Sequence, residues 1–314
     1  MALTTDTLPP FADLPLHDGV GMRHAWDVLE HDLGSLTLLT PDHVAAAATL
    51  VRAGDVFALN LPVDLPGPPL FGREPVRHDV YAIDRNNVDE RLDAYYPQAS
   101  SQWDGLRHVR AKEHGFFGGW DGELHDGAGP LGIEHWARRG IVGRGVLLDI
   151  VRLRECQGRA YDAHGGEEIT AADLTAAAEA QDVELRTADI LCVRTGWVAA
   201  YRDLDGDARD ALGRRPAASG LRADEEMAAW LWDHHLAAVC LDNPAVEVIP
   251  GDPAVGSLHR RLIPMLGFAL AELLDLDDLA AACAADGRSE FLFAAAPMYL
   301  PGGVGSPANA VAIR

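Results

Sequence analysis

Short apolar runs alternate with helix-like segments from residue 44 to residue 296, and no long linker separates them. From the apolar periodicity and the turn residues between them we expect strands at residues 56–61, 78–83, 145–150, 190–194, 237–242 and 291–296. By the same criteria we expect helices at residues 44–53, 133–138, 171–180, 223–234 and 266–274. Alternation of this kind predicts one α/β domain built on a mixed β-sheet. Residues 205–216 are charged and poor in apolar side chains, so we expect them to form an exposed insertion.

Two of these helices begin with recognisable caps. Thr40 precedes Pro41, and this pair combines a good N-cap with a good first helical residue. Gly54 is expected to close that helix. Thr170 is expected to cap the helix over residues 171–180.

Composition excludes some classes of protein. Among 314 residues, 48 Asp and Glu outnumber 26 Lys and Arg, and the net charge of −22 disfavours binding to nucleic acid. No run of 18 apolar residues occurs, so no membrane span is expected. The first 15 residues contain no Lys or Arg and no long apolar run, so we expect a cytoplasmic protein without a signal peptide. The four cysteines form no C-x-x-C pair, which disfavours a thiolate zinc site.

The densest group of polar side chains lies in residues 98–108, which read QASSQWDGLRH. Asp104 and His108 can converge on a metal if this segment turns, although D-x-x-x-H occurs often by chance in a chain with 13 His and 48 acidic residues. A second polar group is His259 followed by Glu272, which we place on the apolar side of the helix at residues 266–274. A buried carboxylate there would need a cation or a metal as partner. On pattern alone, exposure of Glu272 to solvent and a structural role for His259 are the favoured alternatives.

Together these segments resemble the cyclase superfamily of kynurenine formamidase-like metal-dependent hydrolases, which also includes isatin hydrolase. The family motif H-x-G-T-H-x-D-x-x-x-H aligns its metal-binding Asp with Asp104 and its last His with His108. Further landmarks match the longer branch of the family and are found at residues 38–41, 143–149, 189–197, 258–272 and 301–307. The resemblance covers residues 36–313. It implies a swivelling β/β/α cyclase-like fold over residues 36–314, preceded by an N-terminal arm at residues 1–35.

The chain departs from the family motif at its first two histidines, which are Gln98 and Gln102 here. Glutamine offers a neutral carbonyl oxygen in place of an imidazole nitrogen. Even with this departure, the resemblance implies a divalent metal, Mn²⁺ or Zn²⁺, held by four residues. These predicted ligands are Asp104, Gln102, His259 and Glu272.

The activity implied by the resemblance is hydrolysis of a C–N amide, a cyclic amide or a lactone in a small substrate. His108 would act as general acid or base beside Asp104, while Trp103 and Gln98 would contact the substrate. Core packing remains the alternative for Trp103. Two other functions stay open: a cyclase or dehydratase that binds metal weakly or not at all, and a non-catalytic binding protein. The family also implies a homodimer or larger homo-oligomer.

Overall fold

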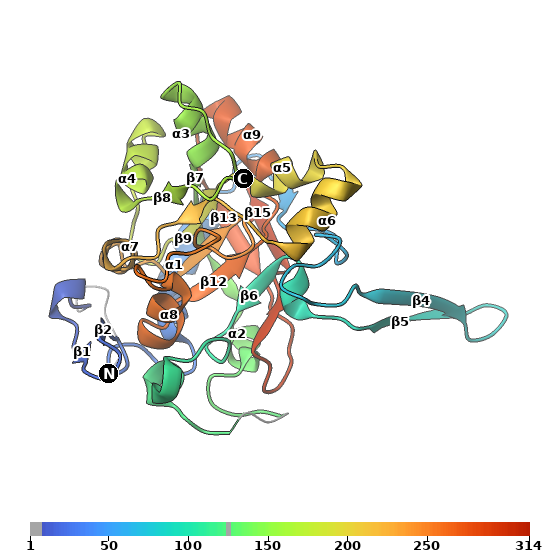
Figure 1. Cartoon of the computed structure of the whole chain (residues 1–314), viewed down its shortest axis with the longest axis horizontal. Coiled ribbons are helices and arrows are strands. Elements are labelled where there is room, and N and C mark those ends of the chain that lie inside the picture. The colour runs from blue at the N-terminus through green and yellow to red at the C-terminus, as the bar shows by residue number, and fades with distance from the viewer. Residues whose placement is uncertain (1–7, 124–126) are drawn as a thin grey trace.

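The computed structural model describes residues 8–123 and 127–314, and Figure 1 traces the chain. Its centre is a nine-stranded mixed sheet in the order β14-β6-β12-β11-β9-β7-β13-β15-β3. The strands of this sheet are β3 (Val56–Ala58), β6 (Gln102–Asp104), β7 (Ile141–Asp149), β9 (Ile190–Arg194), β11 (Ala238–Leu241), β12 (Ala269–Glu272), β13 (Glu290–Ala295), β14 (Gly305–Pro307) and β15 (Ala310–Ile313). The helices are α1 (Pro41–Ala48), α2 (Ile133–Arg139), α3 (Ile150–Cys156), α4 (Ala171–Ala180), α5 (Trp197–Arg202), α6 (Gly206–Arg214), α7 (Glu225–Asp233), α8 (Leu258–Arg260) and α9 (Asp277–Asp286).

Four neighbouring strands, β12, β11, β9 and β7, run parallel. Their residues are nearly all buried, as expected for strands that are covered on both faces. Helical segments connect them along the chain: α3 and α4 follow β7, α5 to α7 follow β9, and α8 follows β11. Strand β6 is antiparallel to β12, and β13 is antiparallel to β7. The predicted α/β class with a mixed sheet is therefore confirmed.

Local signals in the sequence correctly placed several element ends. Thr40 caps α1 by accepting a hydrogen bond from the His43 backbone N–H, although this helix ends at Ala48, before residue 53. Thr170 caps α4, and its capping box is completed by Asp173, whose carboxylate accepts from the Thr170 backbone N–H. Strand β9 has the predicted bounds.

The helix predicted at residues 266–274 is wrong. This segment forms strand β12, with Glu272 as its last residue. Gly267 has φ +72°, a left-handed conformation that ends the π-helical turn over Arg261–Met265 and directs the chain into the sheet. A short apolar run fits a buried strand as well as a buried helix, so its periodicity could not separate the two.

The strand predicted at residues 78–83 exists, but it lies outside the central sheet. It is β4 (Arg77–Ala82), which pairs with β5 (Val88–Asp93) in a separate hairpin. Figure 1 shows this hairpin projecting from the body of the molecule. Residues 205–216, predicted as an exposed insertion, contain the largely exposed helix α6. Two further short pairs are β1 (Leu16–His17) with β2 (Met22–Arg23), and β8 (Glu168–Ile169) with β10 (Gly220–Leu221).

The predicted N-terminal arm contributes side chains to the main core. Phe11, Leu14, Ala25 and Leu29 belong to the same buried cluster as the strands of the central sheet. The boundary at residue 36 stays a prediction. No helix among the described residues is long and apolar enough to cross a bilayer.

Candidate metal centre

Strands β6 and β12 bring three polar side chains to one face of the sheet. In their antiparallel register Gln102 is opposite Glu272, and Asp104 is opposite Leu270. Side chains two residues apart on a strand share a face, so Gln102 and Asp104 lie together and Trp103 points the other way. The Gln102 amide donates a hydrogen bond to the Glu272 carboxylate across the strands. All three polar side chains are almost fully buried.

Helix α8 supplies a histidine to the same face. The Nε2 atom of His259 lies 3.0 Å from Glu272 Oε1 and 3.6 Å from Asp104 Oδ2. Its Nδ1 atom lies 3.1 Å from Glu247 Oε2, which also accepts from the His259 backbone N–H. An Nδ1–H donated to Glu247 leaves the Nε2 lone pair directed at the two carboxylates, which is the tautomer that binds metals.

Three oxygen atoms in this cluster are buried and lack a hydrogen-bond partner among the described residues. They are Asp104 Oδ1, Asp104 Oδ2 and Gln102 Oε1. Potential ligand atoms of Asp104, His259 and Glu272 all lie within 4.8 Å of one another. Buried oxygens that are left without partners are costly unless a cation compensates them. The residues present therefore fit a divalent metal.

The charges of the cluster are strongly coupled. Burial and the nearby Asp104 charge raise the pKa of Glu272 to about 7, although His259 opposes this shift. Burial also favours neutral Asp104, but the positive charges of His108 and His259 outweigh it and lower the pKa of Asp104. For His259, burial lowers the pKa, but the nearby carboxylates of Asp104, Glu247 and Glu272 outweigh it and raise the pKa well above the ordinary value. The carboxylates of the site thus stabilise a nearby cation, which can be a proton on His259 or a metal ion.

The remaining predicted site residues lie at different distances from this cluster. His108 is at its rim, with Nε2 3.6 Å from Asp104 Oδ1 and about a quarter of its side chain exposed. Gln98 lies beside Gly305, whose register partner is Asp104, but it makes no hydrogen bond to the cluster among the described residues. Its contact with substrate stays a prediction.

Trp103 has the surroundings of a core residue. It is fully buried on the opposite face of the sheet and packs edge-on against Trp136 and Phe293. Its indole N–H donates to the Ala308 carbonyl. The alternation of side chains along β6 that brings Asp104 into the cluster turns Trp103 away, so the predicted substrate contact has no support here.

Two residues of the site were not predicted from the sequence. Glu247 orients His259, and Arg73 lies close enough for its positive charge to lower the pKa of both Asp104 and Glu272. Both residues lie outside the helices and strands, and neither belongs to a motif. Glu247 stands at no motif spacing from His259. Arg73 lies within a Pro-rich loop at residues 62–75, where the sequence gave no reason to expect a site.

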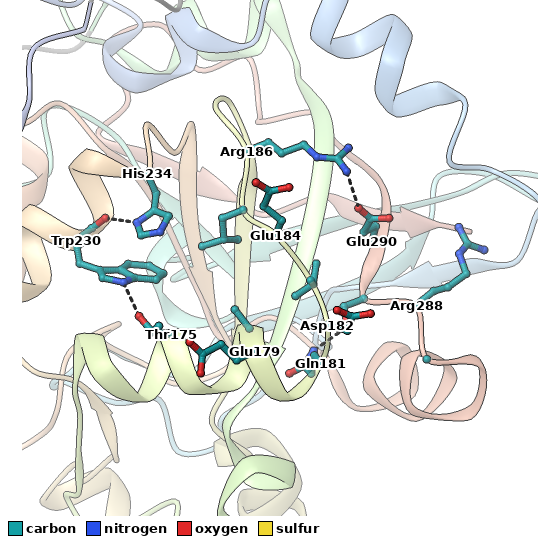
Figure 2. A pocket seen from close by; sticks show the side chains of 15 residues that line it. Thr175, Glu179, Gln181, Asp182, Glu184, Arg186, Trp230, His234, Arg288 and Glu290 are labelled. Atoms are coloured by element: carbon teal, nitrogen blue, oxygen red, sulfur yellow. Dashed lines mark hydrogen bonds and ion pairs between the residues drawn. The ribbon is translucent and has the colours of Figure 1, made fainter.

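A wide hollow of about 1010 Å³ lies elsewhere on the surface, between α4, α7 and the segment before β9. Figure 2 shows two contacts between its side chains: Trp230 donates to Thr175, and Arg186 lies near Glu290. None of the predicted site residues lines it. We therefore place the candidate site at the Asp104 cluster.

Comparison with known families agrees with this arrangement. A family model described as "Putative cyclase" matches residues 67–248, more than half of the chain. The chain belongs to this cyclase family. The resemblance stated from the sequence is thereby confirmed, and the match includes the motif at residues 98–108. A search of curated proteins gave no significant match.

Solved structures give the same family and fold. A structure described as a novel cyclase is 32% identical, covers 93% of this chain and 99% of its own, and superposes with a TM-score of 0.81. Isatin hydrolase A from Labrenzia aggregata is 16% identical over 85% of this chain and 94% of its own, with a TM-score of 0.59. A predicted metal-dependent hydrolase from Bacillus stearothermophilus is 17% identical over 83% and 98%, with a TM-score of 0.52. The last two share the fold, and the cyclase-like fold expected from the sequence is confirmed.

Proposed function

We propose that this protein is a divalent-metal-dependent hydrolase that cleaves a C–N amide, a cyclic amide or a lactone in a small substrate. The observation that carries the proposal is the set of buried, unpartnered oxygens on Asp104 and Gln102 beside His259 and Glu272. Structures of the same fold include an isatin hydrolase and a predicted metal-dependent hydrolase, and this supports the reaction class.

The ligands would be Asp104, Glu272, the Nε2 atom of His259 and the amide oxygen of Gln102. This set is rich in oxygen, which suits Mn²⁺ better than Zn²⁺, because Zn²⁺ favours nitrogen and sulfur ligands. When bound, the metal would polarise the scissile carbonyl and lower the pKa of water.

The surrounding residues prepare the site. Glu247 holds the His259 ring by its Nδ1 atom, and Glu272 fixes the amide of Gln102. His108 stands at the exposed rim of the cluster, where it can reach a substrate and exchange a proton with the attacking water or the leaving group. Arg73 helps to keep the two carboxylates ionised.

The first test is metal content and turnover in the same preparation. We expect Mn²⁺ to restore activity on a panel of small amides, formamides and lactones after dialysis against a chelator. His108→Ala should reduce kcat at least 100-fold, a loss typical of removed acid–base catalysis, and should leave metal content unchanged. If His108→Ala empties the site, His108 is a ligand; full activity in metal-free protein would refute the proposal.

A metal-free cyclase or dehydratase is the second candidate. It is favoured by the paired titration of His259 and Glu272, because an acid and a base with shifted pKa values next to each other can transfer protons without a metal. Turnover that is insensitive to chelation would favour this reaction, and binding without turnover would indicate a binding protein. Assembly as a homodimer or larger oligomer stays a prediction.

A further inference from the structure

The start of the Pro-rich loop is anchored beside the candidate metal centre. The Ser101 hydroxyl, next to Gln102, donates a hydrogen bond to the Leu273 carbonyl and accepts one from the Leu61 backbone N–H. Leu273 directly follows Glu272 in the chain. One buried hydroxyl therefore joins the start of the loop to both segments that carry predicted ligands.

The loop is held at two further points before it reaches the surface. The Tyr201 hydroxyl accepts from the Gly67 backbone N–H and donates to the Gly67 carbonyl. Leu70 is buried in the same apolar cluster as Leu273. Residues 71–73 follow this buried leucine directly, so they emerge from the core at a fixed place near the candidate metal centre.

The first of these three residues, Phe71, has an unfavourable backbone conformation. Its φ is +60°, which is uncommon for a bulky side chain, and Gly72 follows with φ +75°. The Phe71 side chain is half exposed, and the guanidinium of Arg73 lies 5.4 Å from the centre of its ring. Strained residues of this kind cluster at ligand-binding sites, where the surrounding structure holds them in place.

The guanidinium of Arg73 makes no hydrogen bond and no ion pair with any other residue in the described part of the chain, and it is only partly buried. Its positive charge nevertheless acts on both Asp104 and Glu272. A guanidinium offers five N–H donors in a planar fork, which matches a carboxylate. Arg73 can therefore bind an anionic group of a ligand whose reacting bond lies at the metal centre.

We propose that Arg73, supported by the Phe71 ring, binds a carboxylate of the substrate, so that the enzyme acts on small amides or lactones that carry a separate anionic group. This inference rests on the proposed function and names the substrate class of the same site. The net charge of −22 opposes the approach of an anion, so a local cation is needed to hold it. A guanidinium–carboxylate pair with two hydrogen bonds would also orient the scissile carbonyl.

Hippurate and hippuramide test the proposal, because they share one amide and only hippurate carries a carboxylate. We expect Mn²⁺-loaded protein to bind hippurate about tenfold more tightly than hippuramide in isothermal titration calorimetry, which requires no turnover. Arg73→Gln should reduce this preference to less than about twofold, whereas Arg73→Lys should retain part of it, because an ammonium keeps the charge and lacks the planar fork. Arg85→Gln is the matched control, because it removes the same charge from the projecting hairpin (Figure 1).

Circular dichroism and Mn²⁺ content are measured on every variant, and Arg73→Lys carries the comparison if Arg73→Gln does not fold. No binding of hippurate, equal affinities for the two ligands, or a preference that survives in the Arg73 variants would overturn the proposal. The proposed function can fail separately. A preference for hippurate without turnover of any amide or lactone would refute the hydrolase alone, whereas metal-dependent turnover without the preference would refute the substrate class alone.

Discussion

Gln102 stands at a motif position that the cyclase family gives to histidine, and its two amide atoms have different surroundings. Nε2 donates to Glu272, which leaves Oε1 buried and without a partner. The resemblance to the family was enough to predict four candidate metal ligands, and the structure brings them together. They are Asp104, Gln102, His259 and Glu272. Glu247 and Arg73 could not be predicted, because they contribute through a hydrogen bond and a charge from segments that approach only after folding.

Changing this residue tests the ligand set. Gln102→His should tighten Zn²⁺ binding about tenfold, because an imidazole nitrogen replaces an amide oxygen in the same place. Competition with a chromogenic chelator measures the affinity. Gln102→Leu, which removes the amide oxygen that would bind the metal, should weaken Mn²⁺ binding instead. Unchanged Zn²⁺ affinity in Gln102→His would mean that this side chain does not reach the metal.

At the scale of elements, the sequence predicts best where a local signal is unambiguous. The capped starts of α1 and α4 and the bounds of β9 follow from cap residues and a β-rich run. Strand β12 was misread because a buried strand and a buried helix have similar apolar runs, and only Gly267 marked the break. The partner strand β5 was missed because its charged residues lack the expected alternation.

Gly267 supports a prediction with a matched control. It has φ +72°, and an added Cβ would lie 2.7 Å from the Phe117 ring. Gly287 has φ +73°, but nothing lies within 4 Å of its Cβ position. Gly287→Ala should therefore cost about 1 kcal/mol of unfolding free energy from backbone strain alone. Gly267→Ala should cost about 2 to 3 kcal/mol, because overpacking adds to the strain.

Chemical denaturation of both variants measures these costs. The Gly267→Ala protein should also bind metal more weakly, because this glycine directs the chain into the strand that carries Glu272. Equal losses of stability in the two variants would show that the Phe117 ring moves aside without cost.

The capping box of α4 gives a pH-dependent prediction. Burial raises the pKa of Asp173, but hydrogen bonds from Arg154 and Thr170 outweigh it and lower the value to about 2. A lowered carboxylate pKa stabilises the fold above the unfolded value near 3.8, and this stabilisation is lost as pH falls toward 2. Asp173→Asn should cost about 2 kcal/mol at pH 6, and the cost should shrink below pH 4.

Urea unfolding between pH 6 and pH 3 measures this dependence. Thr170→Ala is the comparison, because it removes the cap hydrogen bond from the Asp173 N–H and the hydroxyl hydrogen bond to the Asp173 carboxylate but leaves Arg154 bound to that carboxylate. Its cost of about 1 kcal/mol should fall less between pH 6 and pH 3 than the cost of Asp173→Asn. A cost for Asp173→Asn that stays constant to pH 3 would contradict the assignment.

At the scale of the whole molecule, the β4–β5 hairpin projects from the body of the protein. The large apolar residues exposed on the hairpin are Val80, Tyr81, Ile83, Val88 and Leu92. A two-stranded hairpin alone is only marginally stable in water. The hairpin should therefore open locally far more often than the four parallel strands of the central sheet, which are nearly all buried.

That difference makes the hairpin a cleavage site in the folded protein. Arg85 lies at its tip, so brief trypsin treatment should cut there first and give two fragments that stay together through gel filtration. Each fragment keeps strands of the central sheet, β3 before the cut and β6 after it. Arg85→Gln should delay the first cut, whereas early cleavage within the central sheet would contradict this reading. A fluorophore or an affinity handle inserted at residues 84–87 would then sit outside the core, which makes this tip the natural point for attaching the protein to a surface.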